Sequence, residues 1–272
     1  MADRLPADLA AALDAAGPRL GPFRAIEYFQ EIGSTNDAAL ARASAGAAHG
    51  ALVLADAQQA GRGRRGRAWH SPPEAGLYLS AVLRSEAWAD ALPLVTIAAG
   101  VAVADGLRAA TGLPVELKWP NDVVIGRPWR KLAGILAESA SASPRVETVV
   151  VGIGINVRVS AFPAEIADRA TALEIEAGRA VDRAACLVEV LAALAVWLER
   201  LRDGHRQALV DAWRTYGRAG LGGVAVRWND ETGERLGAAR DIDDTGALLV
   251  DSGGRRMRLV AGEVIWERLR GD

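Results

Sequence analysis

The run Val149-Val150-Val151-Gly152-Ile153-Gly154-Ile155-Asn156 predicts the centre of the fold. A run with so little polarity is typical of a strand that is buried on both faces of a sheet. Glycine has no side chain, so its two occurrences mark places where a neighbouring backbone or a ligand comes close to the strand. The run therefore predicts the middle of a sheet and a surface against which something lies closely.

Further strands and helices are predicted on both sides of this run. Apolar, β-branched or aromatic stretches favour strands at residues 25–32, 51–57, 77–83 and 132–138. Helical spacing of apolar side chains predicts helices at residues 5–13, 92–110 and 187–201, and others are expected at about 35–45 and 206–216. We assign residues 1–220 to one domain, in which residues 1–24 are a short N-terminal helical extension.

The C-terminal residues have a different pattern. Apolar side chains alternate from Val224 to Trp228, and Asp243-Asp244-Thr245-Gly246 and Ser252-Gly253-Gly254 are turn signals between short strands at 248–250 and 257–260. We therefore predict a small antiparallel barrel over residues 221–272, with a domain boundary near 217–223.

A basic loop is the most unusual local feature of the sequence. Four guanidinium groups and three glycines lie between Gly61 and Arg67, with Gln58 before them and Trp69 after them. Arginine pairs with carboxylate and phosphate oxygens, and glycine lets the backbone approach a ligand. Because four like charges repel one another, we expect the loop to be mobile without an anion. These residues alone leave two functions open: an anion-binding loop, or a solvated or nucleic-acid-binding basic patch.

Composition limits the choice of function. The formal net charge of -2 gives no global basic field of the kind that drives non-specific nucleic-acid binding. The single cysteine, Cys186, rules out an internal disulfide, fits a reducing cytosol and is expected to be buried filler. We find no apolar run near the roughly 20 residues of a membrane span and no basic, then apolar, signal segment. These features predict a cytoplasmic protein that does not bind membranes.

Several common chemistries are excluded by missing motifs. The sequence has no G-x-x-x-x-G-K-[ST] phosphate loop and no G-x-S-x-G nucleophile elbow. His49, His70 and His205 are scattered without a second ligand at zinc spacing. What remains is a set of polar residues at predicted strand ends and corners: Ser34, Thr35, Asn36, Gln58, the basic loop, Lys118, Asn121, Asp122, Lys131 and Asn156. This set suits a ligand with an apolar body and an anionic tail. Lysine and arginine side chains could bring the carboxylate of such a ligand to a nucleotide phosphate.

Five motifs in order carry a family resemblance. They are STN at Ser34 to Asn36, QQAGRGRRGRAW at Gln58 to Trp69, KWPND at Lys118 to Asp122, RKLAGILAE at Arg130 to Glu138 and GIGIN at Gly152 to Asn156. Together they resemble the biotin protein ligases. The resemblance implies an α+β catalytic domain like that of class II aminoacyl-tRNA synthetases, followed by an SH3-like barrel. It also implies a two-step reaction, in which biotin attacks ATP to give biotinyl-5′-AMP and a lysine of a biotin carboxyl carrier protein then takes the biotinyl group.

The resemblance also implies roles for individual residues. Ser34, Thr35, Asn36, Gln58, Gly61 and Gly134 are expected to bind biotin, and Arg62, Gly63 and Arg64 to close over biotin and the α-phosphate. Lys131 is expected to bridge carboxylate and phosphate, so Lys131 and Arg64 are the catalytic candidates. Trp69 is expected to stack on adenine, Asn121 and Asn156 to line the nucleotide side, and Asp122 to lie near Mg²⁺. No partner is assigned to Arg65 and Arg67, which are expected in solvent.

The partners follow from the same resemblance. Some members carry an N-terminal winged helix and repress the biotin operon, and the few helical turns before Ile26 are too short for that module, so no direct DNA binding is expected. A homodimer is compatible with the sequence, as is a monomer. Two alternatives are a lipoate or octanoate ligase or transferase acting on a carrier lysine, and a non-catalytic biotin sensor. Against them stand the intact basic loop with KWPND and the retention of Lys131.

Overall fold

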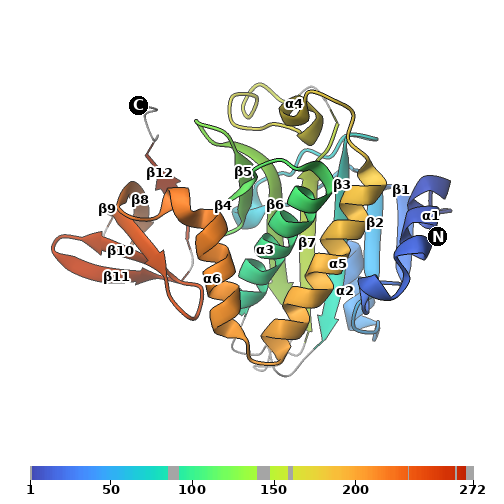
Figure 1. The fold of residues 1–272 in the computed structure, drawn as a ribbon, viewed down its shortest axis with the longest axis horizontal. Coiled ribbons are helices and arrows are strands. Elements are labelled where there is room, and N and C mark those ends of the chain that lie inside the picture. The colour runs from blue at the N-terminus through green and yellow to red at the C-terminus, as the bar shows by residue number, and fades with distance from the viewer. Residues whose placement is uncertain are drawn as a thin grey trace.

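A large sheet organises the chain in the computed structural model, which describes residues 2–84, 92–139, 148–158, 162–231, 233–260 and 262–267 (Figure 1). Its seven strands lie in the order β1 (Ile26–Ile32), β2 (Leu52–Gln58), β3 (Gly76–Arg84), β7 (Thr148–Asn156), β6 (Arg130–Ser139), β5 (Asp122–Ile125) and β4 (Glu116–Lys118). Strands β1 and β2 are parallel, and every other pair is antiparallel. The predicted central strand is confirmed, because β7 lies in the middle with partners on both sides.

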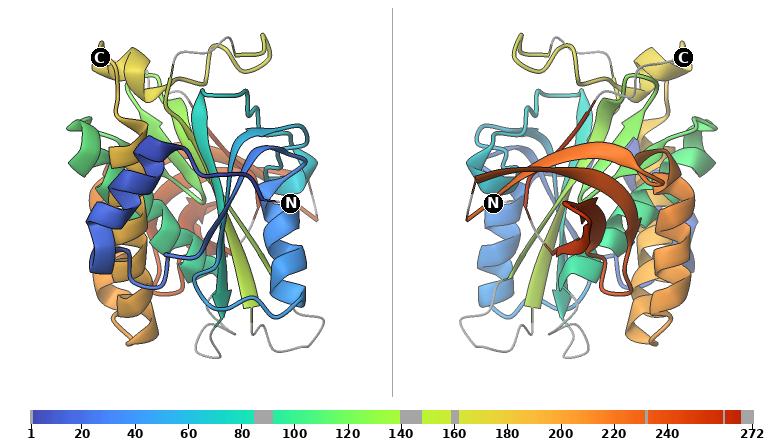
Figure 2. Two further views of the ribbon diagram at one scale, coloured as in Figure 1. Left: turned by 90° about the vertical axis from the view of Figure 1, so that its right-hand side faces the viewer. Right: turned by 90° about the vertical axis from the view of Figure 1, so that its left-hand side faces the viewer.

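Helices cover both faces of this sheet. Helix α2 (Thr35–Ser44) packs on one face through Ala39 and Ala43, against valines of β2, β3 and β7. Helices α1 (Ala7–Ala16), α3 (Leu92–Thr111) and α5 (Arg183–Arg202) lie on the other face, as Figure 2 shows. Two further helices are the short α4 (Leu173–Ala177) and α6 (Arg206–Gly217). The helices predicted from apolar spacing are thus confirmed within a few residues of their expected ends.

Helix α3 corrects one expectation. Residues Pro93–Thr111 are long and apolar enough to cross a membrane by length and composition, with a mean hydropathy of 1.4. The sequence does therefore contain one run of that kind. In the structure 72% of the apolar window is buried, and α3 packs along α5 over β6 and β7. The apolar surface of α3 is thus accounted for by the core of the protein.

The C-terminal residues form a second sheet. Its five antiparallel strands follow the order β11 (Arg255–Leu259), β10 (Leu248–Ser252), β9 (Gly233–Ile242), β8 (Val224–Asp230) and β12 (Val264–Trp266). Three of these strands lie where the sequence predicts them, and β9 and β12 are additional. Closure of this sheet into an SH3-like barrel stays a prediction.

Contacts tie the second sheet to the first near β4 and β5. The indole Nε1 of Trp119 donates to the carbonyl of Gly246 at 2.9 Å. Trp129 and Trp266 meet edge to face with ring centroids 5.9 Å apart. Helix α6 also contacts the second sheet, since Arg214 on this helix pairs with Asp241 of β9 at 2.8 Å. The C-terminal sheet therefore lies against the corner that carries the KWPND motif.

Candidate functional site

A cavity of about 420 Å³ opens between the large sheet, the basic loop and strand β12. Strands β2, β4, β6 and β7, the start of α2 and the basic loop all contribute to its wall. The cavity brings together every site residue predicted from the sequence except Gly61: Ser34, Thr35, Asn36, Gln58, Arg62, Gly63, Arg64, Trp69, Asn121, Asp122, Lys131, Gly134 and Asn156. Gly61 is buried beside it, where a Cβ would lie 2.5 Å from the carbonyl oxygen of Trp69.

Hydroxyl and amide groups gather at the α2 end of the cavity. The carboxamide oxygen of Gln58 accepts from the backbone N–H of Thr35 at 2.8 Å and from its hydroxyl at 3.1 Å. The amide nitrogen of Gln58 donates to Ser71 Oγ at 2.9 Å. Ser34 is the N-cap of α2, as expected of a serine at this position, and it also faces the cavity. These groups form an end of the pocket that can both donate and accept hydrogen bonds.

Asn36 links this polar end to a carboxylate. Its side chain is 4% exposed, and its Oδ1 lies 2.6 Å from Ser80 Oγ on β3. Ser80 Oγ also lies 2.8 Å from the hydroxyl of Thr35. The Nδ2 of Asn36 donates to Glu138 Oε2 on β6 at 2.7 Å. A connected set of hydrogen bonds therefore runs from Thr35 through Ser80 and Asn36 to Glu138.

Glycines make the floor of the cavity. A Cβ at Gly152 would lie 2.1 Å from Asn36 Oδ1, and one at Gly154 would lie 2.4 Å from the indole of Trp69. A Cβ at Gly134, which pairs with Gly154 across β6 and β7, would lie 3.0 Å from the same ring. The close approach predicted for β7 is confirmed, but the sequence predicted a backbone or a ligand there, whereas the groups that come close in the structure are the side chains of Asn36 and Trp69. The indole Nε1 of Trp69 is buried without a hydrogen-bond partner among the described residues.

Positive charge gathers at the other end of the cavity. Lys131 forms an ion pair with Asp122, and its Nζ lies 5.3 Å from the centroid of the Trp69 ring. The backbone of Lys131 is fixed as well, since its N–H donates to the carbonyl of Arg169 at 2.7 Å and its carbonyl accepts from Thr171 at 3.0 Å. This backbone pairing holds Lys131 in the wall while its ammonium faces the cavity.

The basic loop has a defined backbone in this structure. The N–H of Gly63 donates to the carbonyl of Arg67 at 2.7 Å, and Arg65 has a left-handed φ of 58°. Arg62 lies across Glu138, with its two terminal nitrogens 3.0 and 2.8 Å from the two carboxylate oxygens. Asp37 is a second partner, with its Oδ1 2.7 Å from Arg62 Nη2. The mobility expected for the loop without an anion stays a prediction.

The remaining arginines of the loop differ from one another. Arg64 is half-buried and donates to Asn121 Oδ1 at 3.2 Å, and burial lowers the pKa of its guanidinium. Arg65 is exposed, as expected. Arg67 is exposed too, as expected, and it has a partner that the sequence did not assign, because it pairs with Glu263 just before β12. The hydrogen bond from Arg67 lowers the pKa of the Glu263 carboxyl. The sequence could not indicate this pair, whose members are 196 residues apart.

The amides predicted on the nucleotide side hold backbone segments together. Asn121 donates through Nδ2 to the carbonyl of Ile135 at 2.8 Å, which fixes the KWPND corner to β6. Asn156 donates through Nδ2 to the carbonyl of Thr171 at 3.0 Å. The segment before Thr171 then passes along the cavity and contributes Phe162 and Ile166 to its wall. An apolar side wall therefore stands next to the cationic end.

Sequence reasoning missed several residues of this site. Ser80 and Glu138 complete the hydrogen bonds of Asn36. Glu263 and Trp266 add a wall from the C-terminal residues, and Trp129, between β5 and β6, packs against Trp266 there. Ser80 is fully buried, and a hydroxyl inside the otherwise apolar run 77–83 was the available signal. Glu138 closes the quoted RKLAGILAE motif, yet no role was assigned to it. The site as a whole suits a ligand with a polar head, an apolar middle and an anionic end.

The chain is similar in sequence and in fold to known proteins. Residues 28–156 match the model of the Biotin/lipoate A/B protein ligase family, and residues 221–266 match that of the Biotin protein ligase C terminal domain. The chain is 36% identical over 253 residues to the biotin–[acetyl-CoA-carboxylase] ligase of Mycobacterium tuberculosis, covering 89% of each chain. It is 37% identical over 231 residues to the bifunctional ligase/repressor BirA of Bacillus subtilis, covering 83% of this chain and 69% of that protein. Among solved structures, the biotin protein ligase from Aquifex aeolicus in complex with biotin and ATP has a TM-score of 0.79 at 29% identity, covering 90% of this chain and 100% of that one.

Proposed function

The chain belongs to the biotin protein ligase family, and from that membership we propose how its cavity activates biotin with ATP and passes it to a protein. It is an ATP-dependent biotin ligase. The observation that carries this function is one cavity with hydroxyls and amides at one end and cations at the other, in a chain 36% identical to a biotin–[acetyl-CoA-carboxylase] ligase over most of its length. The carrier it modifies is accordingly proposed to be the biotin carboxyl carrier domain of a biotin-dependent carboxylase.

The polar end is proposed to hold the head of biotin. A ureido ring offers N–H donors and a carbonyl acceptor, and Ser34, Thr35, Asn36 and Gln58 present groups of both kinds within the cavity. The glycine floor leaves room for an apolar ring system between this end and Trp69. Buried donors and acceptors reject ligands that leave them unpaired, which favours biotin over an unbranched fatty acid or lipoate.

The cationic end is proposed to bring two anions together. The carboxylate of biotin attacks the α-phosphorus of ATP, and the bond to the leaving pyrophosphate breaks. Lys131 is proposed to exchange Asp122 for oxygens of the carboxylate and the α-phosphate, which lowers the repulsion between them. Arg64, half-buried beside Asn121, is proposed to hold the same phosphate. In the second step the carrier lysine attacks the acyl carbon and AMP leaves.

Adenine is proposed to lie between Trp69 and the apolar wall next to Lys131. Phe162 and Ile166 form that wall, and the indole of Trp69 contacts the glycine floor at Gly134 and Gly154. Asn121 and Asn156 then border the nucleotide, as the resemblance implies. Gly61, Arg62 and Gly63 are proposed to shape the cover over the ligand, with Gly61 acting through its close contact with the backbone of Trp69.

Magnesium is the ion that ATP carries, and Asp122 is the proposed protein ligand. Among the residues that the structure describes, no three His, Cys, Asp or Glu side chains gather to hold a metal alone. A single carboxylate together with phosphate oxygens is a usual environment for Mg²⁺, so the donor set fits. When bound, the ion would neutralise charge on the phosphates.

Three further expectations are part of the same proposal. The ligase is proposed to act in the cytoplasm, where ATP and its carrier are found. No direct DNA binding is proposed, because the net charge of -2 gives no basic field; tight, specific retardation of a biotin-operon operator in a gel at physiological salt would exclude this. The third expectation is that the ligase can form a homodimer, and sedimentation with and without biotin and ATP tests it.

The decisive experiment uses the whole chain with biotin, Mg-ATP and a purified carrier domain. The expected result is one biotinyl group on one lysine of the carrier, read by intact mass and peptide mapping. Omitting ATP should abolish the product. Calorimetry with biotin and with lipoate is the matched comparison, and heat from biotin only is expected. Modification by lipoate instead of biotin would overturn the proposal.

A further inference from the structure

Lysine occurs at only two of the 272 positions, Lys118 and Lys131, whereas the other 30 of the 32 lysine and arginine side chains are arginines. Both lysines line the same cavity. Arginine is a wide planar fork, whereas lysine is a compact ammonium that can be desolvated. A chain that uses arginine almost everywhere therefore keeps its two ammonium groups at one site. Lys131 has a proposed role there, and Lys118 has none.

Strand β4 ends at Lys118 and places it beside the reacting groups. Lys118 pairs in register with Asp122, the residue that holds Lys131. The next residue, Trp119, is 2% exposed and anchored through its indole to Gly246. The backbone at Lys118 is thus fixed by a strand on one side and a buried ring on the other. A side chain on such a support can be held in one place relative to a ligand.

The ammonium of Lys118 is incompletely neutralised. It makes no hydrogen bond or ion pair within the part of the chain that the structure describes. The nearby carboxylates of Asp122 and Glu263 are engaged by Lys131 and Arg67. Burial lowers the pKa of Lys118, and the positive charges of Lys131 and Arg67 act in the same direction, whereas Asp122 and Glu263 oppose the change. Such a cation gains from the arrival of an anion more than a surface cation does.

We propose that Lys118 is a second catalytic cation, which binds the β- and γ-phosphates of ATP and stabilises the pyrophosphate as it leaves. The inference rests on the proposed function. In the adenylation step a biotin carboxylate oxygen forms a bond to the α-phosphorus, and the bond from that phosphorus to the bridging oxygen breaks. The electron pair stays on the bridging oxygen, so negative charge grows on pyrophosphate. Lys131 serves the bond that forms, and Lys118 serves the bond that breaks.

The role predicts that only one half-reaction depends on Lys118. Lys118→Gln keeps a long polar side chain and removes the charge. Adenylation, followed as pyrophosphate release from biotin and Mg-ATP, should fall by about 100-fold or more. Transfer from preformed biotinyl-5′-AMP to the carrier should stay within about twofold, because no pyrophosphate takes part. Unchanged adenylation, or equal losses in both half-reactions, would overturn the assignment.

Chemical rescue separates charge from shape. Lys118→Cys alkylated with 2-bromoethylamine restores an ammonium at nearly the original length, whereas iodoacetamide gives a neutral adduct. The only native cysteine, Cys186, is fully buried and its pKa is raised to about 12, so the reagents should modify position 118 selectively. Adenylation should return with the aminoethyl adduct only. Equal recovery with the neutral adduct would show that Lys118 fills space.

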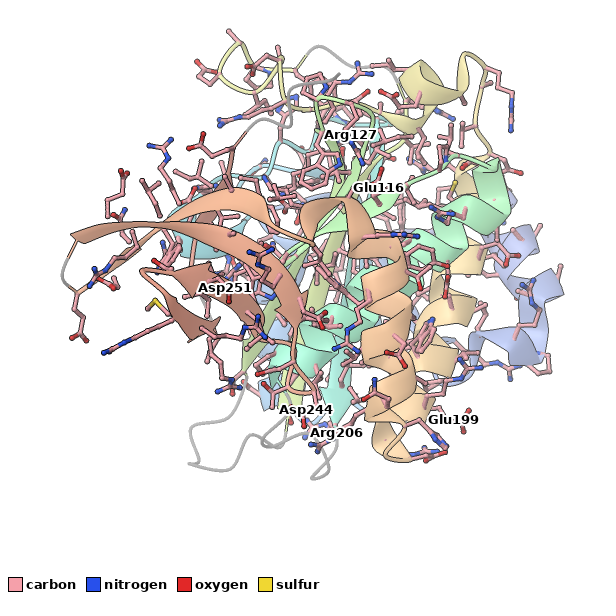
Figure 3. All side chains as sticks on the ribbon, turned by 60° about the vertical axis from the view of Figure 1, so that its left-hand side comes forward. Glu116, Arg127, Glu199, Arg206, Asp244 and Asp251 are labelled. Carbon is pink, nitrogen blue, oxygen red and sulfur yellow. The ribbon has the colours of Figure 1, made fainter. Side chains whose placement is uncertain are left out.

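Arg127→Gln is the matched control. Arg127 follows β5 at the same edge of the sheet and pairs with Glu116 at 2.9 Å (Figure 3). Its guanidinium lies over the ring of Trp129, 5.2 Å from the centroid, and Arg127 does not itself line the cavity. This variant removes the same unit of charge from a solvated ion pair, and its adenylation rate should match that of the parent chain. An equal loss in both variants would mean that the general field of the protein, and not Lys118, attracts ATP. Failure of the parent chain to ligate biotin would instead refute the proposed function.

Discussion

Lys131 is the residue on which the chemistry depends most directly. Its ammonium faces the cavity in an ion pair with Asp122, and its backbone is held by Arg169 and Thr171. The backbone pairing does not involve the side chain, so truncation should leave the fold intact. A change to the Lys131 side chain therefore tests the mechanism without disturbing the backbone that holds it.

Lys131→Ala should lower adenylation by about 100-fold or more while thermal unfolding stays close to that of the parent chain. The physical reason is the loss of the cation that lies between two anions during bond formation. The variant also frees Asp122, which adds negative charge where phosphate must bind. The measurement is pyrophosphate release with saturating biotin and ATP. Normal release would remove Lys131 from the mechanism.

Gly152 tests the floor of the head pocket. Alanine at this position would put a Cβ 2.1 Å from Asn36 Oδ1, so Asn36 must move away from Ser80 and Glu138. Gly152→Ala should therefore weaken biotin binding by about tenfold or more, as expected when a buried polar group loses its partners. Gly33→Ala is the control, because a Cβ there meets nothing within 4 Å. Isothermal titration with biotin compares the two, and equal affinities would contradict the role of the floor.

At the scale of elements, the important contact joins the basic loop to strand β6. Arg62 places both terminal nitrogens on Glu138, and Glu138 also accepts from Asn36. The cover of the cavity is therefore connected to the residues proposed to hold the biotin head. Binding of the head can order the loop through this connection, because both depend on the same carboxylate.

Arg62→Ala and Glu138→Ala should each speed the release of biotinyl-5′-AMP, and the double variant should be no faster than the more severe single one. The expected coupling is about 0.5–1 kcal/mol, since the pair is partly solvated. Stopped-flow release of the adenylate measures it. The pair Arg42 and Glu27 is the control, because it has similar geometry but lies outside the cavity. Additive effects of the two substitutions would contradict the connection.

The sequence predicts long elements well and short ones poorly. The run at 149–156 and the helix at 187–201 bury many apolar side chains, so their pattern is strong. Strand β12 has three residues, and β9 begins with four exposed residues and has no regular apolar alternation, so neither has a local signal. The site divides in the same way. Motif residues were found, whereas Glu263 enters from the far end of the chain and only the folded structure brings it to Arg67.

The whole molecule brings two sheets together around one cavity. Trp119 reaches Gly246 and Trp129 packs on Trp266, so the C-terminal sheet supports the corner that carries Lys118, Asn121 and Asp122. Both lysines of the chain are at this corner or in the strand beside it. The reaction creates an acyl adenylate that acylates amines, and the distribution of lysine over the molecule decides which amines of the ligase are available to it.

Self-biotinylation should therefore be confined to Lys118, Lys131 and the chain's own α-amino group. An adenylate that leaves the cavity meets a surface whose permanent cations are all arginines, and a guanidinium is not a nucleophile at neutral pH. Incubation with biotin and Mg-ATP without carrier, followed by peptide mapping, checks this. Arg42→Lys puts one amine at an exposed position outside the cavity, and the amine introduced there should become labelled. Two results would contradict the prediction: position 42 of this variant stays unlabelled while the parent chain releases adenylate into solution, or other side chains take the label. Either result would mean that the distribution of lysine does not govern acylation of the ligase by its own intermediate.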